Sequence, residues 1–237
     1  MRRGMLIGVA VVVGVLGGIR SARADIIVDQ PPNLTGGPAS DTDYVNYLGQ
    51  PFWQREVDNM LLAQAADISR VVWYGFYGGD GTPATPPPTP ENIQIRFMGA
   101  RPGDGLPDEN GVVFDQTYVN PSRGPTGRIL AGVGGHPAEQ VYQVDFPTPI
   151  HLLGSTGYWI EIVQLGDVNS MFRWEAGSGV LTGHAFTNPL SGGWFATGGS
   201  LAFQLSDVPE PGTGALLSLG ILTLGKCRGR REATRSE

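Results

Sequence analysis

The 237-residue chain has very little cysteine and lysine. Its single cysteine, Cys227, and its single lysine, Lys226, both lie near the C-terminus. The body of the chain, residues 25–211, therefore contains neither residue type. No disulfide can form within it, so packing alone must stabilise it. At 187 residues the body is large enough for one domain with a real core.

Positive charge is also scarce in the body. It holds seven arginines against 20 acidic residues, which gives a net charge of −13. A surface this acidic repels phosphate backbones and excludes nucleic acid as a partner. Cations and neutral sugars stay open as ligands.

Familiar catalytic motifs are missing as well. The three histidines lie far apart in the sequence, none with a second ligand at metal-binding spacing: His136, His151 and His184. The chain has no H-E-x-x-H motif and no G-x-S-x-G elbow, and its one cysteine lies in the tail. We therefore expect a protein that is not an enzyme.

Long amphipathic helices are missing too, and short β-rich runs separated by turns take their place. Gln94 and Arg96 alternate with apolar neighbours, which predicts a half-buried strand, whereas residues 56–66 are ambiguous between strand and helical turn. We expect loops at 101–111 and 120–127. The remaining strands are expected at 26–28, 68–77, 112–119, 140–146, 158–165, 171–174, 184–187, 194–197 and 201–205. About eleven antiparallel strands predict an all-β, two-sheet β-sandwich over residues 25–206, with jelly-roll connections.

One acid within these runs has neighbours that predict burial. Glu161 lies between Trp159 and Val163 on a long apolar strand. Glycosidases on this kind of fold use two facing carboxylates, and Glu175 or Asp145 are candidate partners. The simpler interpretation, which we favour, is a solvated Glu161 or one neutralised by Arg173.

Two further groups are candidate ligand sites. Trp53 and Trp194 lie beside turn residues, and an exposed indole can stack on a sugar ring. The other three tryptophans lie within strands and are expected in the core. Asp104, Asp108 and Glu109 offer hard oxygen ligands suited to calcium, although their spacing fits no EF-hand and solvated loop acids are the commoner case.

The N-terminus has the three parts of a secretory signal peptide. Arg2 and Arg3 precede an apolar run, Leu6 to Leu16, and Ala22-Arg23-Ala24 is an A-x-A cleavage site. Residues 1–24 are therefore expected to be removed after export, with the Sec route favoured over the twin-arginine route.

Residues 207–237 form a second targeting segment. Pro209-Glu210-Pro211 is a rigid break, since each proline fixes φ and removes a donor. An apolar run of about 14 residues, 212–225, follows, and at 1.5 Å per residue it is shorter than a lipid bilayer core. A basic cluster ends the segment: Lys226, Arg228, Arg230 and Arg231. This order resembles the PEP-CTERM sorting signal.

The resemblance implies that Pro209, Glu210 and Pro211 are recognised by an exosortase-type membrane enzyme. The protein would be held transiently at the inner membrane and released to the envelope, cell surface or extracellular matrix. The body also resembles exported single-domain proteins that carry this tail, through WYGFY, PENIQIRF, YWIEIVQLGD and LAFQL. We expect a structural or adhesive role, with a carbohydrate-binding module that recognises extracellular polysaccharide as the alternative and a glycosidase as a remote one.

Overall fold

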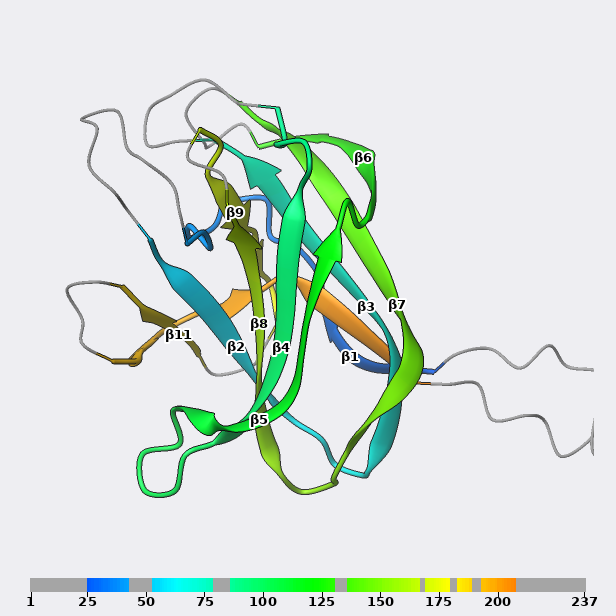
Figure 1. Ribbon diagram of the computed structural model, residues 1–237, viewed down its shortest axis with the longest axis vertical. Coiled ribbons are helices and arrows are strands. Elements are labelled where there is room, and N and C mark those ends of the chain that lie inside the picture. The colour runs from blue at the N-terminus through cyan, green and yellow to red at the C-terminus, as the bar shows by residue number, and fades with distance from the viewer. Residues whose placement is uncertain are drawn as a thin grey trace, which may run out of the picture. The chain divides into compact units, whose positions relative to one another are not determined.

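Strands make up all the regular secondary structure of the described residues (Figure 1). The computed structural model describes residues 25–42, 53–78, 86–130, 136–166, 169–179, 183–188 and 193–207. Within these ranges no helix is long and apolar enough to cross a membrane. The all-β class predicted from the alternating runs is confirmed for this part of the chain.

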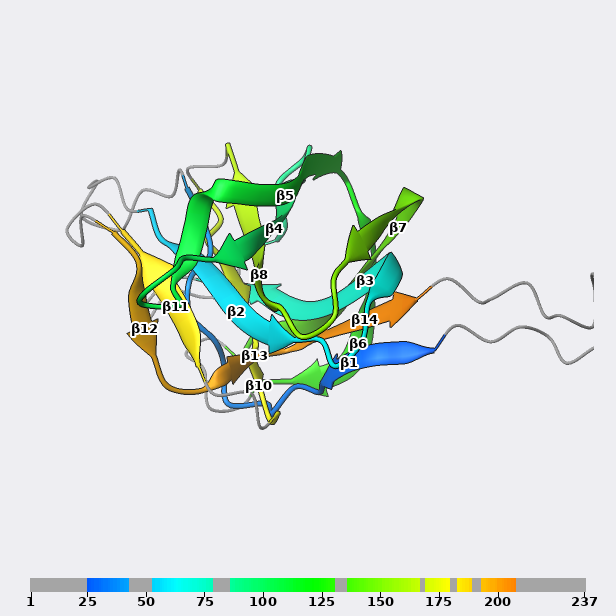
Figure 2. The ribbon, with the colours of Figure 1, turned by 90° about the horizontal axis from the view of Figure 1, so that it is seen from below.

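Two six-stranded antiparallel sheets contain most of the strands. The first sheet has the order β1 (Ile26–Gln30), β14 (Phe203–Asp207), β3 (Ala66–Tyr77), β7 (Ala138–Leu152) and β6 (Ser122–Ile129), with β9 (Phe172–Trp174) also paired to β3. The second has the order β12 (Phe195–Thr197), β11 (His184–Thr187), β2 (Arg55–Leu61), β8 (Gly157–Leu165), β4 (Asn92–Ala100) and β5 (Pro107–Val119). A small third sheet pairs β10 (Ala176–Gly177) with β13 (Ser200–Leu201). The arrangement is sandwich-like, with β4, β5 and β8 facing β3 and β14 in Figure 2.

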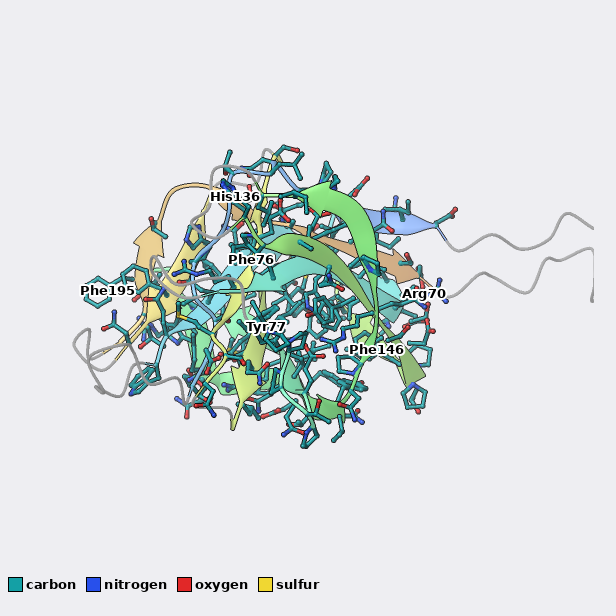
Figure 3. The ribbon with its side chains drawn as sticks, turned by 90° about the horizontal axis from the view of Figure 1, so that it is seen from above. Arg70, Phe76, Tyr77, His136, Phe146 and Phe195 are labelled. Atoms are coloured by element: carbon teal, nitrogen blue, oxygen red, sulfur yellow. The ribbon has the colours of Figure 1, made fainter. Side chains whose placement is uncertain are left out.

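The core lies between the two large sheets because alternate residues of each strand are apolar. Ile95 and Phe97 of β4 are fully buried, whereas Gln94 and Arg96, which alternate with them, face outward, as the pattern predicts. From the other sheet, Tyr142 of β7 stacks on Trp73 at 5.1 Å between ring centroids. Tyr77 and Phe146 also point into the interior, whereas Phe195 lies at the periphery (Figure 3).

Strand β8 is buried on both of its faces. Ile160 and Ile162 face the core, and Trp159, Glu161 and Val163 on the opposite face are also buried. The expectation of a central strand here is correct. Something must therefore cover the outer face of the second sheet, and the candidate site lies there.

Three local expectations change. Residues 120–127, expected as a turn, lie mostly in β6, which tolerates Pro125 because β6 is an edge strand of its sheet. The expected loop at 101–111 is shorter, since β5 begins at Pro107. The ambiguous run at 56–66 is strand β2 followed by a turn and the first residue of β3. The described part thus has fourteen strands where about eleven were expected.

The first and last strands are neighbours. In β1 and β14, Ile26 lies opposite Ser206 and Gln30 opposite Phe203. Residues 26–207 form one compact unit. Its first residue, Ile26, and its last residue, Asp207, lie side by side on neighbouring strands of the first sheet.

Candidate functional site

A network of alternating charges crosses the outer face of the second sheet. It consists of Arg55, Arg96, Glu109 and Glu161, which we call the arginine–glutamate ladder. Strand register creates it: Arg96 of β4 lies directly opposite Glu161 of β8, and Arg55 of β2 reaches Glu161 diagonally, two residues before its partner Val57. Glu109, near the start of β5, is the fourth member and pairs with both arginines.

Every oxygen of the two ladder carboxylates accepts an arginine hydrogen. Arg55 donates to Glu161 through Nε at 2.5 Å and Nη2 at 2.9 Å, and Arg96 donates through Nη1 at 3.0 Å. The same two arginines hold Glu109 at 3.1 Å and 2.7 Å. Burial by itself lowers the pKa of Arg55, but hydrogen bonding and charge interaction with Glu161 raise it above its usual value. The ladder is therefore charged and internally neutralised.

Trp194 closes the ladder from outside. Its indole N–H donates to Glu109 Oε1 at 3.1 Å, and the Arg55 guanidinium lies 5.1 Å from the ring centroid in a cation–π contact. Trp194 is only 7% exposed, so the expectation of a free sugar platform there is wrong. The ring is covered because it packs against Val57 and Trp159 on the outer face of the sheet. Trp53 is half-buried.

Glu161 is buried, so the favoured interpretation of a solvated carboxylate is wrong, and neither its expected neutralising partner nor its expected catalytic partners are correct. Arg173 donates instead to the backbone carbonyls of Gly37 and Gly78. Of the two candidate partner acids, Asp145 pairs with Arg70 at 2.5 Å, and Glu175 interacts with another glutamate. Glu161 has zero exposure and both of its oxygens accept hydrogen bonds from arginines, so it links β8 to β2 and β4.

A second polar group lies on the opposite face of β2. Glu56 and Asp58 are buried beside the core, and His184 Nε2 of β11 lies 3.6 Å from Glu56 Oε2. Asp58 accepts the backbone N–H of Leu201 in β13, and Glu56 accepts the side-chain amide of Gln54. Burial raises the pKa of Glu56 to about 9 and that of Asp58 to about 7, and it lowers the pKa of His184.

Sequence reasoning missed this group. In REVDNML the buried alternate set is Glu56, Asp58 and Met60, and two of its three members are charged, so the pattern did not assign this set to the interior. A neutral carboxyl beside a neutral imidazole can exchange protons, but Glu56 is 1% exposed and Asp58 is fully buried. We therefore interpret the group as a polar link between β2, β11 and β13.

A third cluster joins two glutamates directly. Glu139 and Glu175 are both buried, and their carboxyl groups lie close enough to interact. Arg128 clamps Glu139 with two bonds of 2.6 Å, and the backbone N–H of Leu34 donates to Glu175 at 2.9 Å. Burial and the adjacent Glu139 raise the pKa of Glu175 to about 8, so Glu175 is protonated at neutral pH. The two glutamates lie far apart in the sequence, so the sequence alone does not predict that they interact.

The three expected calcium ligands do not converge. Asp104 pairs with Arg101 at 2.5 Å, Asp108 accepts the backbone N–H of Asn110, and Glu109 belongs to the ladder. No group of three metal-ligating side chains occurs among the residues whose positions are described. Each acid has a nearby cationic or backbone donor, so this arrangement gives the calcium hypothesis no support.

A pocket of about 270 Å³ opens between the β2–β3 turn and the β4–β5 connection. Its lining is mainly apolar and includes Leu61, Ala100, Tyr158 and Trp159. The Trp159 indole N–H is already bonded to the Gly105 carbonyl. None of the buried acids lines this pocket, so it offers space without catalytic groups.

The tail residues lie outside the described ranges: Pro209, Glu210, Pro211, Lys226, Arg228, Arg230 and Arg231. The sorting-signal expectation is therefore neither supported nor opposed by the geometry. No protein-family model matches the chain, and no curated protein matches it.

Proposed function

We propose that this chain is an exported, non-catalytic β-sandwich protein with a structural or adhesive role in the cell envelope or extracellular matrix. One observation carries the proposal: the acids best placed for chemistry are used inside the fold. Glu161 is enclosed by two arginines, and Glu139 and Glu175 are enclosed with each other. Buried ion pairs of this kind favour a fixed arrangement of strands over a reactive surface.

The proposed location rests on the two targeting segments, residues 1–24 and 207–237. An apolar leader over residues 1–24 is expected to direct export, and the Pro209-Glu210-Pro211 motif is expected to recruit an exosortase-type enzyme at the inner membrane. Because β1 and β14 are neighbours, the first and last residues of the compact unit, Ile26 and Asp207, lie close together.

We assign the connections to the jelly-roll type. Successive strands cross between the two large sheets at β1–β2, β2–β3, β3–β4, β5–β6, β7–β8 and β8–β9, and the first and last described strands pair with each other. These crossings support the assignment, and an experimental structure of the whole body would test it.

Mass spectrometry of envelope and secreted fractions tests the proposal. Mature protein should begin at Asp25 and lack residues 226–237. Changing Pro209, Glu210 and Pro211 to alanine should leave an unprocessed form in the inner membrane, and deleting Leu6 to Leu16 should abolish export. A wild-type protein with an intact C-terminus at Glu237 would contradict sorting through this tail.

Carbohydrate binding is a second candidate because of an aromatic pair on β11 and β12. The Phe186 and Phe195 rings lie 6.1 Å apart at an interplanar angle of 28°, and Phe195 is 49% exposed. Exposed ring faces can bind sugars through apolar contacts. Binding to a polysaccharide array that disappears in Phe195→Ala, but persists in Leu153→Ala, would favour this function. An array without binding would favour the structural role.

A further inference from the structure

Strand β5 is the last strand of the second sheet, and its outer edge is open. It pairs with β4 on one side, and no described strand pairs with its other side (Figure 1). Residues 114–119 pair with residues 92–97 in an unbroken register, and the irregularities begin only beyond Phe97. The strand therefore presents a straight row of backbone donors and acceptors, which is a template for another strand.

Two of the usual protections of an edge strand, lysine and proline, are missing from the part of β5 that follows Pro107. Between residues 108 and 119 there is no lysine and no proline. The charge of Asp115 is directed back over the sheet, since its carboxylate accepts from Gln94 at 2.7 Å and lies 3.5 Å from Arg96. The edge strand β6 of the first sheet, by contrast, carries Pro125 and two arginines.

The sequence of β5 identifies the strand that fits. Residues 113–119 read VFDQTYV, which is nearly palindromic in residue type. If two copies pair antiparallel around Gln116, every residue meets a complementary one. The resulting cross-strand pairs within the regular run are Phe114 with Tyr118, Asp115 with Thr117, and Gln116 with itself. Val113, which would meet Val119, lies at the register shift of β5.

Such pairs are the stabilising units of a sheet. Aromatic pairs, β-branched pairs and hydrogen-bonding pairs each favour the register that makes them. Phe114 and Tyr118 are half-buried against Phe146, so a second copy would extend the aromatic core across the junction. Val119 is 62% exposed and would gain a covering neighbour. The five regularly paired residues, 114–118, would add about four to six backbone hydrogen bonds.

We propose that two copies of this chain associate through β5, joining their second sheets into one continuous antiparallel sheet with a two-fold axis at Gln116. A self-complementary segment on an unprotected edge favours a second copy over an unrelated strand, which would have no reason to match it. This inference does not depend on export or on the tail.

Cysteine cross-linking tests the register directly. In the full-length chain carrying Cys227→Ser, purified in mild detergent, Gln116→Cys places one thiol opposite its own copy, within the separation that a disulfide needs. Mild oxidation should give a covalent dimer on a non-reducing gel. Asp115→Cys is the matched control: its thiols would be diagonal, about 7–8 Å apart, and should link poorly.

A pair of charge variants tests the same contact without cross-linking. Thr117 is exposed and would face Asp115 of the other copy. Thr117→Lys should tighten the dimer and Thr117→Glu should weaken it, each by about two- to thirty-fold over the two symmetric pairs, as measured by sedimentation. Circular dichroism checks that each variant is folded. A folded Gln116→Cys protein that fails to cross-link, equal linking by Asp115→Cys, or equal association of both charge variants would overturn the proposal.

Discussion

Replacing Asp58 by asparagine should remove part of the pH dependence of stability. Burial raises the pKa of Asp58 from its usual 3.8 to about 7, so the folded state holds a proton that the unfolded chain releases. Its contribution to stability is fully present below about pH 4 and is lost as the pH rises through 7. The pKa change corresponds to about 4 kcal/mol, of which about 3 kcal/mol is lost between pH 5 and 8.5.

Asparagine suits this position for a geometric reason. Its side-chain oxygen can still accept the backbone N–H of Leu201, and its amide group can donate close to Gln30. The variant carries no charge that must be buried at high pH. We therefore expect Asp58→Asn to be more stable than the wild type at pH 8.5 and to differ much less at pH 5. Without the Asp58 charge, the pKa of Glu56 should also fall, which flattens the profile further.

Denaturant unfolding followed by tryptophan fluorescence at pH 5, 7 and 8.5 measures the effect, because four of the five tryptophans are buried. Asp29→Asn, at an exposed carboxylate of β1, is the control and should track the wild type. Parallel pH profiles for Asp58→Asn and the wild type, or a variant less stable at pH 8.5, would refute the reasoning.

Three further outcomes are expected. Glu161→Ala should destabilise the body by about 3–5 kcal/mol in denaturant unfolding, because it leaves Arg55 and Arg96 without their buried counter-charge; a loss below 1 kcal/mol would show that the ladder is incidental. Millimolar calcium should leave the melting temperature unchanged relative to chelator, since arginines hold Asp104 and Glu109; a reproducible rise would revive the calcium hypothesis. Circular dichroism of the purified chain should show less than about one-fifth helix, and a larger fraction would contradict the all-β assignment.

The sequence predicted those parts of the fold in which one face of a strand is apolar. The alternation around Ile95 and the long apolar run of β8 located their strands and the inward residues correctly. The prediction was wrong at β6, where glycine and proline suggested a turn. An edge strand tolerates these residues, but the local sequence does not show that a segment will lie at a sheet edge.

The candidate site was less predictable. The apolar neighbours of Glu161 suggested burial, although a solvated or Arg173-neutralised Glu161 was favoured. Its arginine partners come from β2 and β4, and only the strand order brings them together. Glu139 and Glu175 meet for the same reason. Register between distant strands is set by the whole fold, and the local pattern of a single strand carries no information about it.

The pairing of the first and last strands has a mechanical consequence. A load applied to both ends of residues 26–207 would separate β1 from β14 one hydrogen bond at a time, because those ends lie side by side. A load that enters only at Asp207 and leaves through a distant surface would instead pull β14 lengthwise between β1 and β3. All of its hydrogen bonds would then resist together. A body attached by its C-terminal end alone would therefore be the more resistant to tension.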